Sequence, residues 1–471
     1  MKLHSAHKVA LIRSGSRADL FLDKQLGSGQ FSYKDIFSML LPLILDQFFI
    51  NIIGLLTTAM ISSSSQESVS AVSLVTPLYM MIYSIFNAIS AGGTVIVAQY
   101  KGRGDAGKIR IAAGQVMLAT SLAATVLCII LIIFANPLVY TLFSAADPLV
   151  KEKARNYLVG VSLSLIFHSF YMGSFAVFRG VGDTKTCLRL TIIINLIHLF
   201  ASMIFINGLH MDITGTVLSL NIARVIGGGF AVFLLVRPKS KFRIYAKDVF
   251  HLDFSILRSI FKIGVPFALE QVFFNGGGML VQTYIVFLGT ISVAANAIAS
   301  SAFSILYSSG IAVSTLTITV VGQCIGAGDK ALAKRYGAKM IWLGTLIVVL
   351  SLAVFMPLMS LILKLYQAPA NTLSLIFNLL WIAAIPMPFF WSVSNIMPCV
   401  LRSAGDANFS SIASLITMWA IRVGLGYLFA LPLGLGVQGV WICMGIEWAV
   451  RTVIFYLRFR SDAWLTKNTI D

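Results

Sequence analysis

Twelve long apolar segments separated by short polar ones constrain the fold of this chain more than any other feature. A helix needs about 20 mostly apolar residues to cross the hydrocarbon core of a bilayer. Of the 471 residues, 58% are apolar and only 11% are charged, whereas soluble domains carry about 25% charged residues. The chain lacks the charged residues that would cover a soluble core of this size. A soluble enzyme, a disordered chain and a nucleic-acid-binding protein are therefore excluded.

The pattern predicts an all-α polytopic membrane protein with twelve transmembrane helices. The predicted spans cover residues 36–61, 69–98, 111–135, 154–178, 187–207, 214–236, 263–288, 291–322, 338–361, 372–400, 409–430 and 438–457. The first thirty residues are polar and basic without a sustained apolar stretch, so they do not resemble a cleavable signal peptide. Pro386, Pro388 and Pro398 predict a bent tenth span, because proline removes a helical hydrogen bond.

The distribution of basic residues predicts the orientation of the chain. Of its 35 Lys and Arg residues, 28 lie in the two termini and in the loops on the same side, and four lie in the opposite loops. Cytosolic loops of membrane proteins are the ones enriched in Lys and Arg. We therefore expect a multi-pass protein of the plasma membrane with both termini and the basic segment 237–262 in the cytosol.

The sequence contains an internal repeat with an offset of 223 to 224 residues. The motif Q-x-x-G-x-G-D occurs at 99–105 and again at 323–329, and R-x-x-G-D occurs at 179–183 and at 402–406. The stretch from Pro42 to Asn51 matches the stretch from Pro266 to Asn275. Six spans separate the copies, so the two halves have the same orientation and are parallel repeats.

The repeat divides the chain into two pseudo-symmetric six-helix lobes around a central cleft. We expect a cytosolic N-terminal tail at 1–35, an N-lobe at 36–236, a cytosolic linker at 237–262, a C-lobe at 263–457 and a cytosolic C-terminal tail at 458–471. The Q-x-x-G-x-G-D turns lack the strand and the G-K-[ST] sequence of a phosphate-binding loop. They are instead tight glycine turns, in which Asp105 or Asp329 caps the following helix.

The two six-helix halves, the paired Q-x-x-G-x-G-D loops and the paired R-x-x-G-D turns resemble the multidrug and toxic compound extrusion (MATE) family. The similarity covers residues 31–460. It implies alternating access by two lobes and export of organic, usually cationic and amphipathic compounds in exchange for Na⁺ or H⁺. That family belongs to the MOP flippase superfamily, which also contains lipid-linked oligosaccharide flippases.

Asp46 and Glu270 are the most informative charged residues, because they occupy equivalent positions in the first helix of each lobe. A charge inside a span costs about 2.5–3.5 kcal/mol on insertion scales, so each one needs a reason. A carboxylate in low-dielectric surroundings binds a proton or a cation as its exposure changes. Neutral oxygens next to these acids would suit Na⁺; the predicted ion-coupling residues are Glu270, Asp46, Gln271, Asn275, Gln47 and Asn51. The alternative is that each acid only pairs with an Arg and holds helices together.

The chain departs from the MATE family at other acidic positions. Thr57 stands where many members carry Asp late in the first helix, and Ala201 and Ser202 stand where the fifth helix carries Leu-Asp. The tenth span contains no Asp or Glu, whereas one branch of the family has a cation ligand there. We therefore expect Glu270, with Asp46 second, to carry a role that other members share among more acids.

The remaining polar and aromatic residues of the spans predict the substrate cleft. Arg224 and Arg422 lie in the middle of spans; they either pair with acids or carbonyls, or form a basic cavity wall that favours an anion. Glu447 and Arg451 are four residues apart and predict an intrahelical ion pair. His168 is expected to be a packing residue. The predicted cleft residues are Arg224, Arg422, Asn195, His198, Trp419, Trp391, Tyr79 and Met80.

These patterns predict a monomeric secondary antiporter and no enzyme. Its expected partners are the lipid bilayer and a small organic substrate, with no nucleic acid. No cofactor is predicted, only Na⁺ or H⁺ as the coupling ion, and no metal beyond Na⁺ at Glu270; the five cysteines form no C-x-x-C pair. Two alternatives remain open, namely a lipid-linked sugar flippase and an exporter of an anionic metabolite that uses Arg224 or Arg422. A membrane enzyme or a channel is a further rival. The sequence contains no H-E-x-x-H cluster and no nucleophile–base motif, and a channel would need a continuous polar pore.

Overall fold

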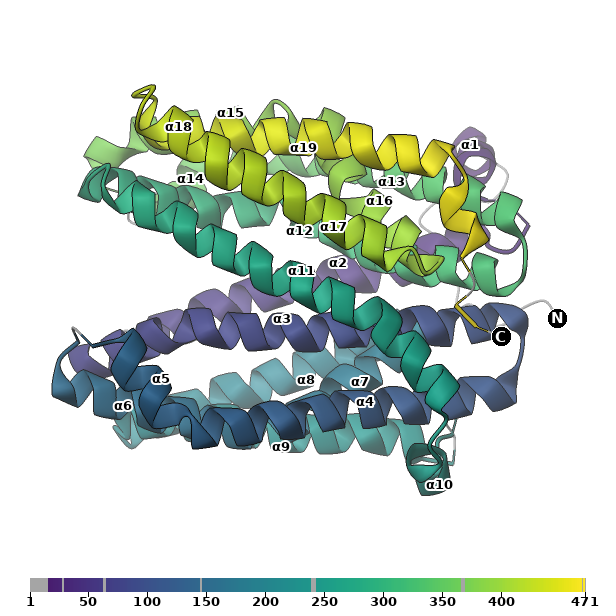
Figure 1. Ribbon diagram of the computed structural model, residues 1–471, viewed down its shortest axis with the longest axis horizontal. Helices are drawn as coiled ribbons and strands as arrows, with labels where there is room; N and C mark the ends of the chain where they lie inside the picture. The colour runs from purple at the N-terminus through teal and green to yellow at the C-terminus, as the bar shows by residue number, and fades with distance from the viewer. Residues whose placement is uncertain are drawn as a thin grey trace. The chain divides into compact units, whose positions relative to one another are not determined.

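Every secondary-structure element of the computed structural model is a helix within the described residues (Figure 1). The structure describes residues 16–27, 29–61, 65–144, 146–238, 243–365, 369–467 and 469–470. The chain forms two compact units. Unit 1 contains Met1–Gln47 and Leu269–Asp471, and unit 2 contains Phe48–Ala268.

Unit 2 begins within helix α2 and ends within helix α11. Its elements are the later part of α2 (Tyr33–Ile61), α3 (Gln66–Arg103), α4 (Ala106–Ile133), α5 (Ala135–Leu142), α6 (Pro148–Leu163), α7 (Leu165–Val181), α8 (Thr184–Ser202), the π-helix η1 (Met203–Gly208), α9 (Asp212–Val236), α10 (Ala246–Phe250) and the start of α11 (Phe254–Val286). Helix α7 packs against α3, α4 and α9 (Figure 1). Glycine permits this, since a Cβ on Gly228 of α9 would lie 2.3 Å from the carbonyl oxygen of Phe167.

Unit 1 consists of the start of the chain and its C-terminal half. After α1 (Arg17–Leu26) and the first part of α2, it contains the later part of α11, α12 (Thr290–Gly326), α13 (Lys330–Phe355), α14 (Met359–Leu365), the 3₁₀ helix η2 (Ala370–Thr372), α15 (Leu373–Ala384), the π-helix η3 (Met387–Trp391), α16 (Ser392–Ser403), α17 (Ala407–Thr417), the π-helix η4 (Met418–Leu425), α18 (Gly426–Ala430), α19 (Gly436–Arg460) and the 3₁₀ helix η5 (Ala463–Thr466).

All twelve predicted spans coincide with helical segments. Among the described residues, nine helices are long and apolar enough to cross a membrane, and two bent helix pairs raise the number to as many as eleven. The pair formed by Ala370–Ala384 and Met387–Ser403 bends by 40°, which confirms the bend predicted from its prolines. The remaining predicted span, 263–288, lies in α11, which contains Glu270, Gln271 and Asn275 and is not among these eleven.

The repeat of the sequence is visible in the backbone of both units. Gly104 and Gly328 have φ angles of 80° and 79°, a conformation that glycine adopts without steric cost. The carboxylates of Asp105 and Asp329, one residue later in each copy, accept hydrogen bonds from the amides of Lys108 (2.9 Å) and Leu332 (2.8 Å). The predicted glycine turns and aspartate caps are thereby confirmed.

The segments at the ends of the chain and between the predicted lobes pack more closely than their description as tails and linker implies. Leu26 is fully buried in a core cluster with Leu40 of α2 and Leu316 of α12, and Trp464 near the C-terminus is fully buried as well. In unit 2, the amide of Gln115 on α4 donates to the carbonyl oxygen of Asp248 in the linker helix α10 (3.2 Å). Apolar residues in these polar segments explain the packing.

Candidate functional site

The buried ion pair between Glu270 and Arg402 is the candidate ion-coupling site in unit 1. Glu270 on α11 is 4% exposed, and its Oε2 lies 2.5 Å from Nη2 of Arg402. The Nε of Arg402 donates a hydrogen bond to the hydroxyl of Ser410 (3.2 Å). Both partners are buried, so little water screens the pair. Gly405 follows Arg402 with a φ of 91° and reverses the chain, so that α17 brings Ser410 back to the guanidinium.

Asp46, the counterpart of Glu270 in the repeat, is fully buried on α2 and belongs to the same compact unit. Its neighbour Gln47 is half-buried and ends the first segment of unit 1, whereas Asn51 lies in unit 2. On α11, Gln271 and Asn275 are half-buried, and Nδ2 of Asn275 donates to the backbone carbonyl of Gln271 (2.7 Å). The structure thus buries both predicted acids. The four amide side chains that follow them in the sequence are half-buried and carry oxygens that could coordinate a cation.

Glu447 is the centre of a second buried charge cluster in unit 1. Its side chain has no exposed surface, and its two oxygens lie 2.6 Å from Nε of Arg422 and 3.2 Å from Nη1 of Arg451. The predicted pair of Glu447 and Arg451 is confirmed. Arg422, on η4, also pairs with Glu447, as one of the two interpretations of this arginine requires.

One face of α17 links the two charge clusters. Ser414 lies four residues after Ser410, so both hydroxyls lie on the same face of this helix. Ser410 accepts from Arg402, and Ser414 accepts from Nη2 of Arg451 (2.9 Å). A change at either ion pair therefore acts on the same helix.

Arg224 of α9 is the buried cation of unit 2. Its side chain is 4% exposed, and it donates to the hydroxyl of Ser164 (2.8 Å), to the carbonyl of Val161 (3.3 Å) and to the hydroxyl of Tyr79. The guanidinium also lies over the ring of Tyr79, 5.2 Å from its centroid. Unit 2 thus brings together two residues of the predicted cleft, namely Arg224 and Tyr79, while His198 on α8 is half-buried.

The other predicted cleft residues have different surroundings within their own units. Asn195 on α8 is half-buried and donates to the carbonyl of Thr191 in its own helix (2.8 Å). Trp391 is 4% exposed in the core of unit 1 and stacks on Tyr307, with ring centroids 6.0 Å apart. Met80 and Trp419 are 49% and 39% exposed, so they line no closed site within their own units.

Arg402 belongs to the candidate site although the sequence pattern did not predict it. The sequence pattern assigned it to the R-x-x-G-D turn. Glu270 and Arg402 are 132 residues apart, so no spacing within one helix reveals the pair. The one signal in the sequence was the recurrence of the arginine at the start of both R-x-x-G-D turns.

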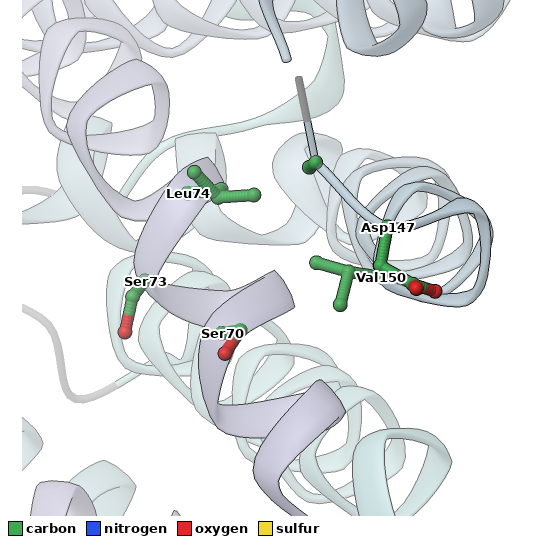
Figure 2. A pocket seen from close by; sticks show the side chains of 6 residues that line it. Ser70, Ser73, Leu74, Asp147 and Val150 are labelled. Atoms are coloured by element: carbon green, nitrogen blue, oxygen red, sulfur yellow. The ribbon is translucent and has the colours of Figure 1, made fainter. Parts of the chain in front are cut away.

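A separate pocket in unit 2 lies between α3 and the start of α6 (Figure 2). It is lined by Ser70, Ser73, Leu74, Ala146, Asp147 and Val150. Asp147 caps α6 by accepting from the amide of Leu149 (2.9 Å). The pocket contains none of the predicted site residues. Within the described residues, no group of three or more His, Cys, Asp or Glu side chains is placed to hold a metal ion.

Two repeated sets of long apolar helices, with ion pairs buried inside unit 1 and a buried arginine inside unit 2, are typical of a polytopic membrane protein of the transporter class. The MatE family model matches this chain twice, at residues 42–204 and 266–428. The two matches begin and end 224 residues apart, in agreement with the repeat. The chain belongs to the MatE family.

Relatives and solved structures agree with this assignment over nearly the whole chain. The Bacillus subtilis protein named uncharacterized transporter YisQ is 28% identical over 442 residues, covering 92% of this chain and 95% of the relative. A Thermotoga maritima protein named probable multidrug resistance protein NorM is 23% identical and covers 92% and 93%.

Two solved structures share the fold. The first is a MOP superfamily transporter from Pyrococcus furiosus, described as having a binding pocket of reversed polarity. It matches with a TM-score of 0.83 at 19% identity and covers 92% of this chain and 97% of its own. The second, a MATE transporter in the bent conformation, has a TM-score of 0.83 at 18% identity and covers 96% and 99%.

Proposed function

We propose that this protein is a secondary antiporter that exports amphipathic organic compounds in exchange for Na⁺ or H⁺. The observation that carries the proposal is the buried pair of Glu270 and Arg402, 2.5 Å apart, at a position repeated as Asp46 in the other half of the sequence. Relatives named as multidrug resistance proteins support an export function. The protein acts as a monomer in the plasma membrane with both termini in the cytosol, and the ion is its only cofactor.

Coupling follows from competition for the carboxylate of Glu270. A proton or a Na⁺ ion at Glu270 neutralises the charge that holds Arg402. A buried guanidinium that loses its carboxylate costs about 3–5 kcal/mol, so ion binding favours a conformation in which Arg402 finds other partners. An ion shifts a conformational equilibrium only through such a difference in binding free energy.

Neutral groups near the acid would complete a site for a bound cation. Gln271 and Asn275 follow Glu270 on the same helix and offer amide oxygens, which hard cations such as Na⁺ prefer. The shared face of α17 then passes the change to the cluster of Arg451 and Glu447, because Ser410 and Ser414 contact one ion pair each. Asp46 supports the same exchange as a second buried carboxylate.

Glu270→Gln tests the proposal, since it keeps the shape of the side chain and removes the charge. Purified protein is reconstituted in proteoliposomes, and efflux of cationic and anionic dyes is followed under an imposed pH or Na⁺ gradient. We expect the variant to lose the stimulation by the gradient while it still binds dye. Glu152→Gln, which neutralises an exposed acid on α6, is the matched control. Undiminished gradient-driven efflux by Glu270→Gln refutes the assignment.

A further inference from the structure

The buried charges of the two units are balanced differently. In unit 1, each of the arginines 402, 422, 451 and 458 lies within 3.2 Å of a carboxylate oxygen. In the described part of unit 2, Arg224 and Asp248 are the buried charged residues, and Asp248 pairs with Arg110 at 3.0 Å. Arg224 is left with neutral partners.

Hydroxyl and carbonyl groups accept hydrogen bonds from Arg224, and among the described residues no carboxylate forms an ion pair with it. The contacts with Val161, Ser164 and Tyr79 use three hydrogen bonds, whereas a guanidinium has five N–H donors. A charge buried without an opposite charge is costly, and inside a membrane such residues mark functional sites. Thr57, Ala201 and Ser202, at positions where the family resemblance implies acids, carry no charge, and the hydroxyl of Ser202 donates to that of Ser219 (3.1 Å).

A second unsatisfied group lies one helical turn from a partner of this cation, because Ser164 accepts from Arg224 and the backbone amide of His168 donates to the carbonyl oxygen of Ser164 (3.0 Å). The side chain of His168 on α7 is 8% exposed, and its Nε2 has no hydrogen-bond partner within the part of the chain that the structure describes. Buried polar atoms without partners are rare in folded proteins and call for a physical reason. A bound acceptor in this region would meet both a cation and an imidazole nitrogen.

Aromatic rings continue from the cation along α3 and α7. Tyr79 lies 6.4 Å from Tyr83, Tyr83 lies 5.5 Å from His168, and His168 lies 5.9 Å from Tyr171, measured between ring centroids. Tyr79 and Tyr83 are half-buried, and so is His198. Rings of this kind offer faces and edges to a flat apolar body, so the shell of Arg224 combines one positive charge with an aromatic wall.

We propose that Arg224, Tyr79 and His168 form a subsite in unit 2 for an aromatic organic monoanion that carries a carboxylate or sulfonate group. Two oxygens of a carboxylate or of a sulfonate can accept from two N–H groups of a guanidinium, and one negative charge balances the buried cation of unit 2. This inference rests on the proposed export function and names its substrate class. It favours the anion over the cationic compounds that the family resemblance implies. It assigns the anion to Arg224, since Arg422 already pairs with the carboxylate of Glu447.

Equilibrium binding to the purified full-length protein tests the subsite without any ion gradient. The probes share one aromatic body: 2-naphthalenesulfonate, 2-naphthylmethylammonium and the neutral 2-naphthylmethanol, measured in lipid-free detergent and in sulfate buffer. We expect the wild-type protein to prefer the sulfonate over the ammonium compound by about tenfold or more. Arg224→Gln should lose that preference and keep the affinity for the neutral probe.

Further variants keep the test decisive if Arg224→Gln does not fold. Arg224→Lys retains the charge and loses the fork, so the sulfonate preference should fall without reversing. Arg155→Gln, which removes a cation on α6 that bonds to Asn136, is the control and should leave binding unchanged. Equal binding of the two charged probes by wild-type protein, or a sulfonate affinity of Arg224→Gln within about twofold of wild type, overturns the subsite. Because no gradient is used, this result stands apart from the efflux test of Glu270.

Discussion

Replacing Glu447 with Gln should destabilise the protein more than any other single change to a charged residue in unit 1. The glutamine keeps the volume of the side chain, but Arg422 and Arg451 both lose their carboxylate. The formal charge of this three-residue cluster rises from +1 to +2 in a place with no exposed carboxylate surface. Breaking a buried ion pair by removing one partner costs about 3–5 kcal/mol.

This free energy converts into a measurable shift of the thermal midpoint. Complete unfolding of a chain of this length has an entropy of about 1 kcal/mol/K at about 2.1 cal/mol/K per residue. The midpoint of detergent-solubilised Glu447→Gln, measured by size-exclusion chromatography after heating, should therefore fall by about 3–5 °C. Helices that persist in detergent lower the unfolding entropy and make the shift larger.

A double variant separates lost charge balance from lost packing. Glu447→Gln with Arg451→Met returns the formal charge of the cluster to +1, and it should recover about half of the lost stability because coupled charges are not additive. Glu152→Gln serves as the exposed control. The reasoning is refuted if Glu447→Gln lowers the midpoint by less than about 1 °C, or if the double variant is as unstable as the sum of its single changes.

Two further variants test the packing of the linker and of the N-terminal segment. Gly114→Ala would place its Cβ 2.2 Å from the backbone oxygen of Asp248, so α10 must move away from α4 and the free energy of unfolding should fall by about 1–3 kcal/mol. Gly107→Ala, whose Cβ would meet the flexible side chain of Asp105, is the control. Equal thermal midpoints of the two variants would contradict the clash. Leu26→Ala removes a fully buried side chain from the core of unit 1 and should cost about 2–5 kcal/mol, whereas Phe21→Ala, at a position 53% exposed, should leave the melting midpoint nearly unchanged.

The sequence was sufficient for features that repeat or that lie within one helix. Apolar length located the twelve spans, and the recurrence of glycine and aspartate located the turns whose geometry is now seen twice. Gly215 and Gly439 extend this agreement. A Cβ on either would lie 2.9 Å from the backbone ten residues earlier, at Phe205 and Phe429. Such contacts depend on local chain geometry, which a motif specifies.

The sequence was insufficient for contacts between elements far apart in the chain. Arg402 was read as part of a turn because its carboxylate partner lies on a helix that begins about a hundred and fifty residues earlier. Trp391 was assigned to the cleft because aromatic residues suit organic cations, but it fills the space beside Gly310, whose Cβ would lie 2.3 Å from the indole. Residue type alone does not distinguish a ligand-facing ring from one that packs a core.

The membership of α2 in both compact units has a consequence for biosynthesis. Residues 1–47 leave the ribosome before residues 269–471, yet both belong to the same core. Unit 1 therefore cannot mature during translation until α19 has been inserted, and a fragment cut at the segment before α10 would lack part of each core. Early truncations should accumulate as substrates for membrane quality control, however intact their individual helices are.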